Sequence, residues 1–125
     1  MTTIFDAGAL IGLERNDRSM WVRLKGLSND GEVPVTHGGV VGQVWRGGPR
    51  QARLAAALKA IDVRPLDERL GRLAGELLAA TRLSDVVDAA LVVLALDGDD
   101  IITLDSDDLG VLASAAGRHV ELIRP

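Results

Sequence analysis

The chain of 125 residues contains no cysteine and no tyrosine, and its only aromatic residues are one phenylalanine and two tryptophans. The absence of cysteine excludes disulfides, thiolate catalysis and zinc sites with cysteine ligands, and it fits a reducing compartment. Three aromatic side chains are too few for the stacking platform on which single-strand-binding proteins hold bases. Any grip on a nucleic acid must therefore rely on phosphates, shape or bound metal.

Long hydrophobic runs and a basic stretch at the N-terminus are also missing. The longest nearly apolar stretch, residues 86–96, is too short to span a bilayer. We therefore expect no export signal, no membrane insertion and a cytoplasmic location. The length is close to the commonest domain size and 47% of the residues are hydrophobic, so we expect residues 1–125 to form a single domain.

Basic residues are absent between Arg82 and Arg118, where acidic residues are frequent. The aspartates of this segment are Asp85, Asp88, Asp97, Asp99, Asp100, Asp105, Asp107 and Asp108. Crowded carboxylates raise one another's pKa, so a fold keeps them together mainly where a cation neutralises them or where they face open water. All fourteen lysines and arginines lie elsewhere, and they can form a basic surface that meets phosphates around an acidic site despite the net charge of −4.

Short β-prone runs alternate with helical patterns along the chain, which indicates an open, mainly parallel sheet covered by helices on both faces. We expect strands at residues 3–5, 33–35, 61–64, 101–104 and 120–123. We expect one helix directly after Asp6 and a second from after Ser19 to about Asn29. Further helices are expected over residues 38–46, 50–60, 67–82 and 109–116. Another helix should run from an N-cap at Ser84 to Leu96.

Three aspartates are the main candidates for chemistry. Asp6 and Asp105 each end an expected strand, and Asp88 lies near the start of a strongly apolar helix. Ligands of open α/β folds bind beyond the C-terminal strand ends, so these carboxylates can converge on one site for Mg²⁺ or Mn²⁺. Such a metal can activate a water and stabilise charge on a phosphodiester. The structural alternative is that Asp6 and Asp105 are helix N-caps.

The remaining acidic and histidine residues have simpler interpretations. Asp85 suits the first turn of a helix, where the dipole favours negative charge. Asp107 and Asp108 either enrich a helix start in the same way or, for Asp108, add a secondary metal ligand. His37 fits a turn, and neither His37 nor His119 has a partner at ligand spacing. A solvated turn accounts for the others: Asp97, Asp99 and Asp100.

Three segments resemble the motifs of PIN-domain ribonucleases: IFDAGALIGL, SDVVDAALVVLAL and IITLDSDDL. The resemblance covers essentially the whole chain, and its motif order and the VWRGGPRQARL segment are most similar to the toxin half of VapBC-type toxin–antitoxin pairs. It implies a three-layer α/β/α PIN-like domain with a central, mainly parallel sheet, which cuts RNA with Mg²⁺ or Mn²⁺. It also implies a homodimer and inhibition by a small VapB-like antitoxin whose tail occupies or crosses the active-site groove.

By motif, the family's metal-binding aspartates correspond to Asp6, Asp88 and Asp105. The family usually has a glutamate on the helix before the tryptophan and arginine, whereas VVGQVWR places Gln43 there. An amide oxygen can coordinate a metal but carries no charge, so the affinity for the cation should fall. Arg46 and Arg50 are candidates for contacts to phosphate, although a solvated helix face explains them almost as well.

Two functions follow as hypotheses. The first is a metal-dependent endoribonuclease that acts as the toxin of a toxin–antitoxin pair. The second, supported mainly by Gln43, is a catalytically impaired PIN-like module that binds RNA or a partner protein. A phosphate-accepting receiver domain also places acids around magnesium, but it needs a lysine beside the phosphoryl group and the C-terminal half of this chain has none.

Overall fold

A five-stranded parallel sheet forms the middle layer of the protein, and the computed structural model describes all residues from Met1 to Pro125. The strands lie in the order β3-β2-β1-β4-β5, and every neighbouring pair is parallel. Their bounds are β1 (Thr3–Phe5), β2 (Val35–His37), β3 (Asp62–Arg64), β4 (Asp100–Ile102) and β5 (Glu121–Ile123).

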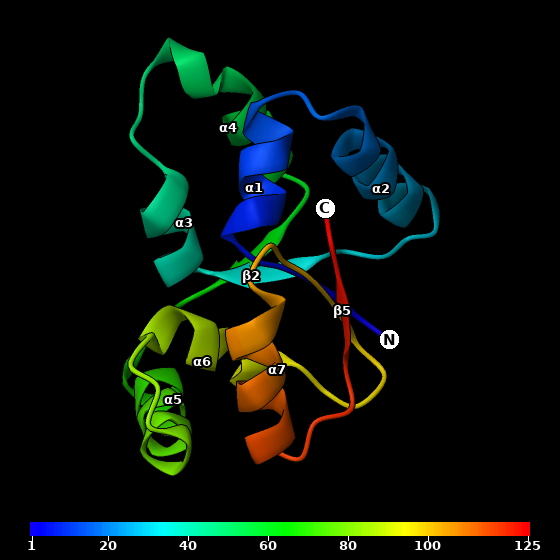
Figure 1. Ribbon diagram of the computed structural model, residues 1–125. Coiled ribbons are helices and arrows are strands. Elements are labelled where there is room, and N and C mark those ends of the chain that lie inside the picture. The colour runs from blue at the N-terminus through cyan, green and yellow to red at the C-terminus, as the bar shows by residue number, and fades with distance from the viewer.

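Helices cover both faces of this sheet (Figure 1). One layer contains α1 (Ala7–Glu14), α2 (Arg18–Asn29), α3 (Gly38–Val44) and α4 (Ala52–Leu58), with the 3-10 turn η1 (Pro49–Gln51) before α4. The other contains α5 (Glu68–Thr81), α6 (Val86–Leu94) and α7 (Ser106–Ala115). The three-layer α/β/α arrangement expected from the sequence is therefore confirmed. None of these helices has the length and apolar character needed to cross a membrane.

The core lies on both faces of the two central strands. Ile4, Phe5, Ile101 and Ile102 are at most 1% exposed, because a parallel sheet covered on both faces offers its central strands no polar side. Full burial of one such side chain contributes about 1.5–3 kcal/mol. Helix α6 packs into the same core, and its single charged residue is Asp88.

The second strand lies two residues later than the sequence analysis predicted. Val33 is 57% exposed, whereas Val35, Thr36 and His37 are buried and form β2. The polar residues can be buried here because their side chains find partners; the Thr36 hydroxyl, for example, donates to the carbonyl oxygen of Phe5 at 2.8 Å. The turn expected for His37 was also wrong, because this residue ends β2 and is the N-cap of α3.

The cap of α6 is Asp85 and not Ser84. The Asp85 carboxylate accepts hydrogen bonds from the backbone N–H groups of Val87 at 2.9 Å and Asp88 at 3.2 Å. A carboxylate at this position also interacts favourably with the positive end of the helix dipole. The helix ends at Leu94, two residues earlier than expected, and Leu96 is 63% exposed.

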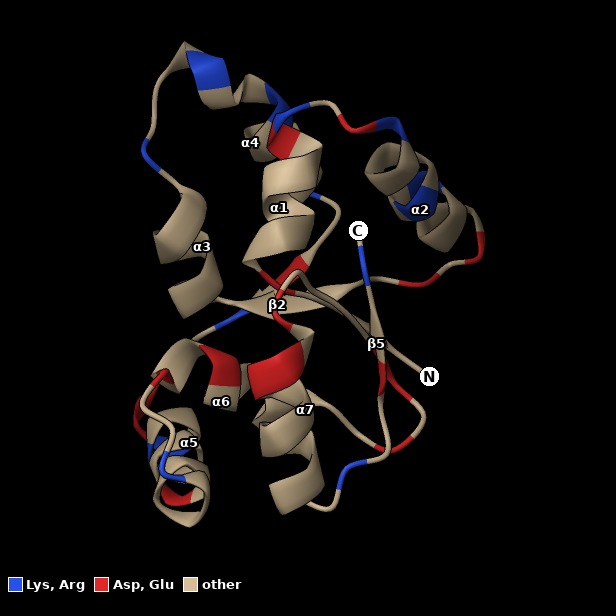
Figure 2. Ribbon diagram, viewed as in Figure 1, with Lys and Arg blue, Asp and Glu red and all other residues tan.

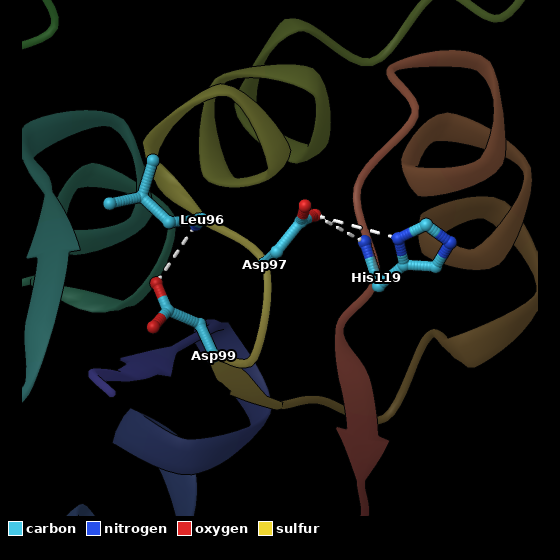
Figure 3. Close-up of polar contacts among 4 residues, drawn as sticks. All are labelled: Leu96, Asp97, Asp99 and His119. Atoms are coloured by element: carbon cyan, nitrogen blue, oxygen red, sulfur yellow. Dashed lines mark hydrogen bonds and ion pairs between the residues drawn. The ribbon is translucent and has the colours of Figure 1, made fainter.

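The acidic turn before β4 is not simply solvated. Asp99 is 4% exposed, and its carboxylate accepts hydrogen bonds from the backbone N–H groups of Thr2 at 2.7 Å and Leu96 at 2.9 Å, the latter drawn in Figure 3. Asp100 is half-buried as the first residue of β4. The prediction of a solvated turn was therefore wrong for Asp99, which directly precedes β4, and for Asp100, which begins it. Asp97 does stay exposed, and it accepts from the His119 backbone N–H at 2.8 Å (Figure 3).

Candidate metal centre

The candidate site lies where β1 and β4 end in the middle of the sheet. These strands pair in parallel with Phe5 opposite Ile102, so the segments that follow them leave the same edge side by side. Helix α1 begins directly after β1, and α7 begins shortly after β4. Helices α6 and α7 pack against each other, and Figure 2 shows their acidic first turns next to one another.

Asp6 caps α1 at the end of β1. One carboxylate oxygen, Oδ1, accepts from the Ala7 backbone N–H at 2.7 Å, and Oδ2 accepts from the Thr103 hydroxyl at 2.8 Å. Asp6 is 5% exposed, and this burial raises the pKa of its carboxyl above the ordinary value, while the two hydrogen bonds oppose the rise. The cap interpretation is thus confirmed for Asp6, and its oxygens keep lone pairs that can face a cation.

Thr103 connects the ends of the two central strands. Its hydroxyl donates to Asp6 and accepts from the backbone N–H of Asp105 at 2.9 Å, and the residue is 1% exposed. Thr103 was not among the functional residues predicted from the sequence. The available signal was a hydroxyl group two positions before an aspartate, in an otherwise apolar run.

Asp88 lies in the first turn of α6 and is 5% exposed. Burial raises the pKa of its carboxyl to about 7, and the negative charges of Asp85 and Asp6 contribute to the same rise. The neighbouring carboxyl group of Asp105 favours the protonated form further. Asp88 is therefore only partly ionised near neutral pH unless a cation replaces its proton.

The structure brings three carboxylates together: those of Asp88, Asp105 and Asp108 offer oxygen atoms within 4.8 Å of one another. Asp88 is buried, and the other two are exposed at the start of α7. Asp105 precedes α7 but makes no capping hydrogen bond with its side chain, so its oxygens are available. Three carboxylates at this spacing suit a hard divalent cation such as Mg²⁺ or Mn²⁺. Asp6 lies outside this group, although its charge acts on Asp88.

The position at which PIN-domain ribonucleases usually have a glutamate is exposed in this protein. Gln43 lies on α3, which contains no acidic residue. Arg46 follows this helix, and its guanidinium donates to the carbonyl oxygens of Gly42 at 3.0 Å and Trp45 at 2.7 Å. Arg50 is exposed in η1. Both arginines keep N–H groups that can bind a phosphate.

Gln51 is a second residue that the sequence analysis missed. It is 6% exposed, and its Oε1 accepts from the backbone N–H groups of Arg46 at 2.7 Å and Gly47 at 2.9 Å. Its Nε2 donates to the carbonyl oxygen of Val44 at 2.8 Å and to the carboxylate of Glu14 at 2.6 Å. The loop that carries Arg46 is therefore anchored to the end of α1.

Comparison with known proteins found no family model that matches the chain and no curated protein sequence that matches it. Among solved structures, a chain of the crystal structure of VapBC2 from Rickettsia felis, bound to a DNA fragment from their promoter, matches with a TM-score of 0.68. The match covers 98% of each chain at 12% sequence identity. At this identity the likeness shows the fold. The chain therefore has the three-layer PIN-like fold of a protein in a VapBC complex.

Proposed function

We propose that the protein is a metal-dependent endoribonuclease and the toxin of a toxin–antitoxin pair. The observation that carries this proposal is the group formed by Asp88, Asp105 and Asp108, next to the buried Asp6, at the C-terminal edge of a parallel sheet. The fold shared with a chain of VapBC2 supports the assignment as a toxin.

The residues of the site fit Mg²⁺ or Mn²⁺, because all are oxygen donors. Asp88, Asp105 and Asp108 would hold the ion, and Asp6 adds negative charge beside it. When bound, the ion would supply an activated water and would stabilise the charge that develops on the phosphodiester. Asp88 would lose its proton in order to serve as a ligand, and the Thr103 hydroxyl bonds to both Asp6 and the backbone of Asp105.

The substrate and partners belong to the same proposal. Arg46 and Arg50 bind RNA phosphates, because a guanidinium offers paired N–H donors to phosphate oxygens. A small VapB-like antitoxin inhibits the protein by covering the acidic edge, in line with the VapBC complex whose chain shares the fold. The protein acts in the cytoplasm as a single domain that pairs into a homodimer.

A second candidate function is a PIN-like module with impaired catalysis that binds RNA or a partner protein. Gln43 favours it, since an uncharged amide on α3 replaces the glutamate of the resembling family. The substitution Gln43→Glu separates the two candidates. A large gain of Mn²⁺-dependent cleavage from an inactive parent favours the impaired module, whereas an active parent favours the nuclease.

The proposed nuclease is tested by cleavage of structured RNA with Mg²⁺, Mn²⁺ or chelator, using purified protein free of antitoxin. We expect Asp88→Asn and Asp105→Asn each to reduce cleavage by about 100-fold or more, because the metal supplies several kcal/mol of transition-state stabilisation. The matched control is Asp107→Asn, which removes an exposed carboxylate from the same turn of α7 but outside the group. Cleavage that persists in both site variants would contradict the proposal.

A further inference from the structure

Outside the group of Asp88, Asp105 and Asp108, His37 is the largest buried residue that has a titratable side chain. It is 0% exposed at the end of β2. Its Nδ1 accepts a hydrogen bond from the Gly39 backbone N–H at 3.0 Å, and its Nε2 lies 2.9 Å from the carbonyl oxygen of Val87. Because Nδ1 is an acceptor, the proton lies on Nε2, which donates to Val87. Burial lowers the pKa of the imidazole, which keeps this neutral form.

The Val87 carbonyl belongs to the turn that presents Asp88. The other side-chain hydrogen bonds in this turn are accepted by the carboxylate of Asp85, which is the cap of the same helix, so they shape the helix without attaching it to the sheet. The bond from His37 joins the turn to the C-terminal edge of the sheet, where Asp6 and Asp105 also lie. It therefore restrains the position of Asp88 relative to the other carboxylates.

The fit around the ring shows that its position is tightly defined. A Cβ atom added at Gly39 would lie 2.8 Å from Cε1 and 3.0 Å from Nδ1 of His37, and 3.0 Å from the side chain of Leu66. Only glycine allows α3 to begin this close to the imidazole. The ring is thus held between the start of α3 on one side and the start of α6 on the other.

We propose that His37 is a positioning residue that links the first turns of α3 and α6 and thereby holds Asp88 in the geometry required for metal binding. The part that concerns RNA cleavage rests on the proposed nuclease function. His37 itself is no ligand, because both ring nitrogens are occupied by backbone partners. Residues that orient a metal ligand in this way typically change metal affinity by about 10–100-fold when replaced.

Two substitutions test the two hydrogen bonds of the His37 ring one at a time. In His37→Asn, Oδ1 can still accept from Gly39, but the side chain is too short to reach Val87. In His37→Gln, the longer amide can donate to Val87, while the helix cap is poorer. We expect His37→Asn to bind Mn²⁺ about tenfold more weakly than the parent and His37→Gln to bind it more tightly than His37→Asn.

The binding measurement is calorimetric titration with Mn²⁺ alone, accompanied by thermal unfolding and by amide hydrogen exchange of metal-free protein. We expect faster exchange in the first turns of α6 in His37→Asn, with α5 as the internal reference. Equal Mn²⁺ affinity and equal exchange in the parent and His37→Asn would overturn the proposal. Losses of Mn²⁺ affinity that parallel a drop in melting temperature in both variants would also overturn it, since they would indicate general destabilisation.

Failure of the His37 link and failure of the proposed nuclease function give different results. If the parent neither binds Mn²⁺ nor cleaves RNA, the proposed nuclease is wrong, and the exchange of α6 alone decides the role of His37. Unchanged exchange in His37→Asn would then reject the link between the two helices. Faster exchange confined to α6 would support it.

Discussion

At the scale of single residues, Asp88 combines deep burial with a carboxylate that the proposed chemistry requires. Burial removes water from the charged form, and three neighbouring aspartates repel it, so the pKa rises from 3.8 to about 7. A divalent cation reverses both effects because it replaces the lost hydration and neutralises the neighbours. The residue is therefore poorly accommodated as an anion until a cation binds.

The raised pKa predicts a pH dependence of metal binding. Below about pH 7 the cation must displace a proton from Asp88, so we expect Mn²⁺ affinity to fall by up to about tenfold for each pH unit and to level off above pH 7. Calorimetric titrations from about pH 5.5 to about pH 8.5, a range roughly centred on that pKa, measure this slope. An affinity that does not change across this range would contradict the assignment of Asp88 as a ligand.

The same shift affects the stability of the metal-free protein. Because the folded pKa lies above the unfolded value of 3.8, the folded state binds more protons than the unfolded state between these values. The contribution of Asp88 to stability is therefore fully present below about pH 4 and is lost as the pH rises through about 7. Asp88→Asn removes this titration, which provides the control for urea unfolding at several pH values.

At the scale of elements, two of the segments next to the site were predicted from their apolar patterns. Helix α6 and strand β4 are nearly continuous apolar runs, and both were expected from the sequence. The error in β2 occurred where a polar side chain has a tertiary partner. β2 extends to His37 because its ring bonds to Val87, which lies 50 residues further along the chain. No local pattern contains this information.

The loop between α3 and α4 provides a prediction at this scale. Gln51→Glu places a carboxylate against that of Glu14 and removes two N–H donors, so we expect a loss of about 1–3 kcal/mol in the free energy of unfolding. The double substitution Glu14→Gln with Gln51→Glu restores one donor between the two side chains and should recover part of that loss. Urea unfolding of both variants measures the coupling. Equal stability of the single and double variants would show that this pair does not anchor the loop.

At the scale of the whole molecule, basic and acidic segments gather in different places, although α5 carries residues of both signs. Figure 2 shows basic segments on α2 and around α4 in one layer, and acidic first turns on α6 and α7 in the other. The sheet separates these layers and presents its C-terminal edge between them. An RNA held by the basic layer would meet the acidic group only if a cation reduces the repulsion, which links metal binding to substrate binding.

Metal binding should also stabilise the fold, because the proposed ligands come from two different helices: Asp88 from α6, and Asp105 and Asp108 from the start of α7. At a Mn²⁺ concentration of 100 times the dissociation constant, ligand linkage contributes about 2.7 kcal/mol, and we expect the melting temperature to rise by roughly 10 °C. Asp88→Asn should show little of this rise, whereas Asp107→Asn should behave like the parent. Thermal unfolding with Mn²⁺ or chelator tests the prediction, and an equal rise in all three proteins would place the metal elsewhere.

The alternation of strands and helices, the parallel sheet and the placement of Asp6 and Asp105 after buried strands were predicted from the sequence, although β4 ends at Ile102 and not at Leu104. They could be predicted because apolar periodicity is a local property of the chain. The membership of the acidic group depends on packing. Asp108 joins Asp88 and Asp105 whereas Asp6 lies outside the group, and Thr103 bonds to Asp6 across 97 residues. Such distances arise only when β1 pairs with β4 and α6 packs on α7, since the sequence specifies which side chains are present but not how closely they approach.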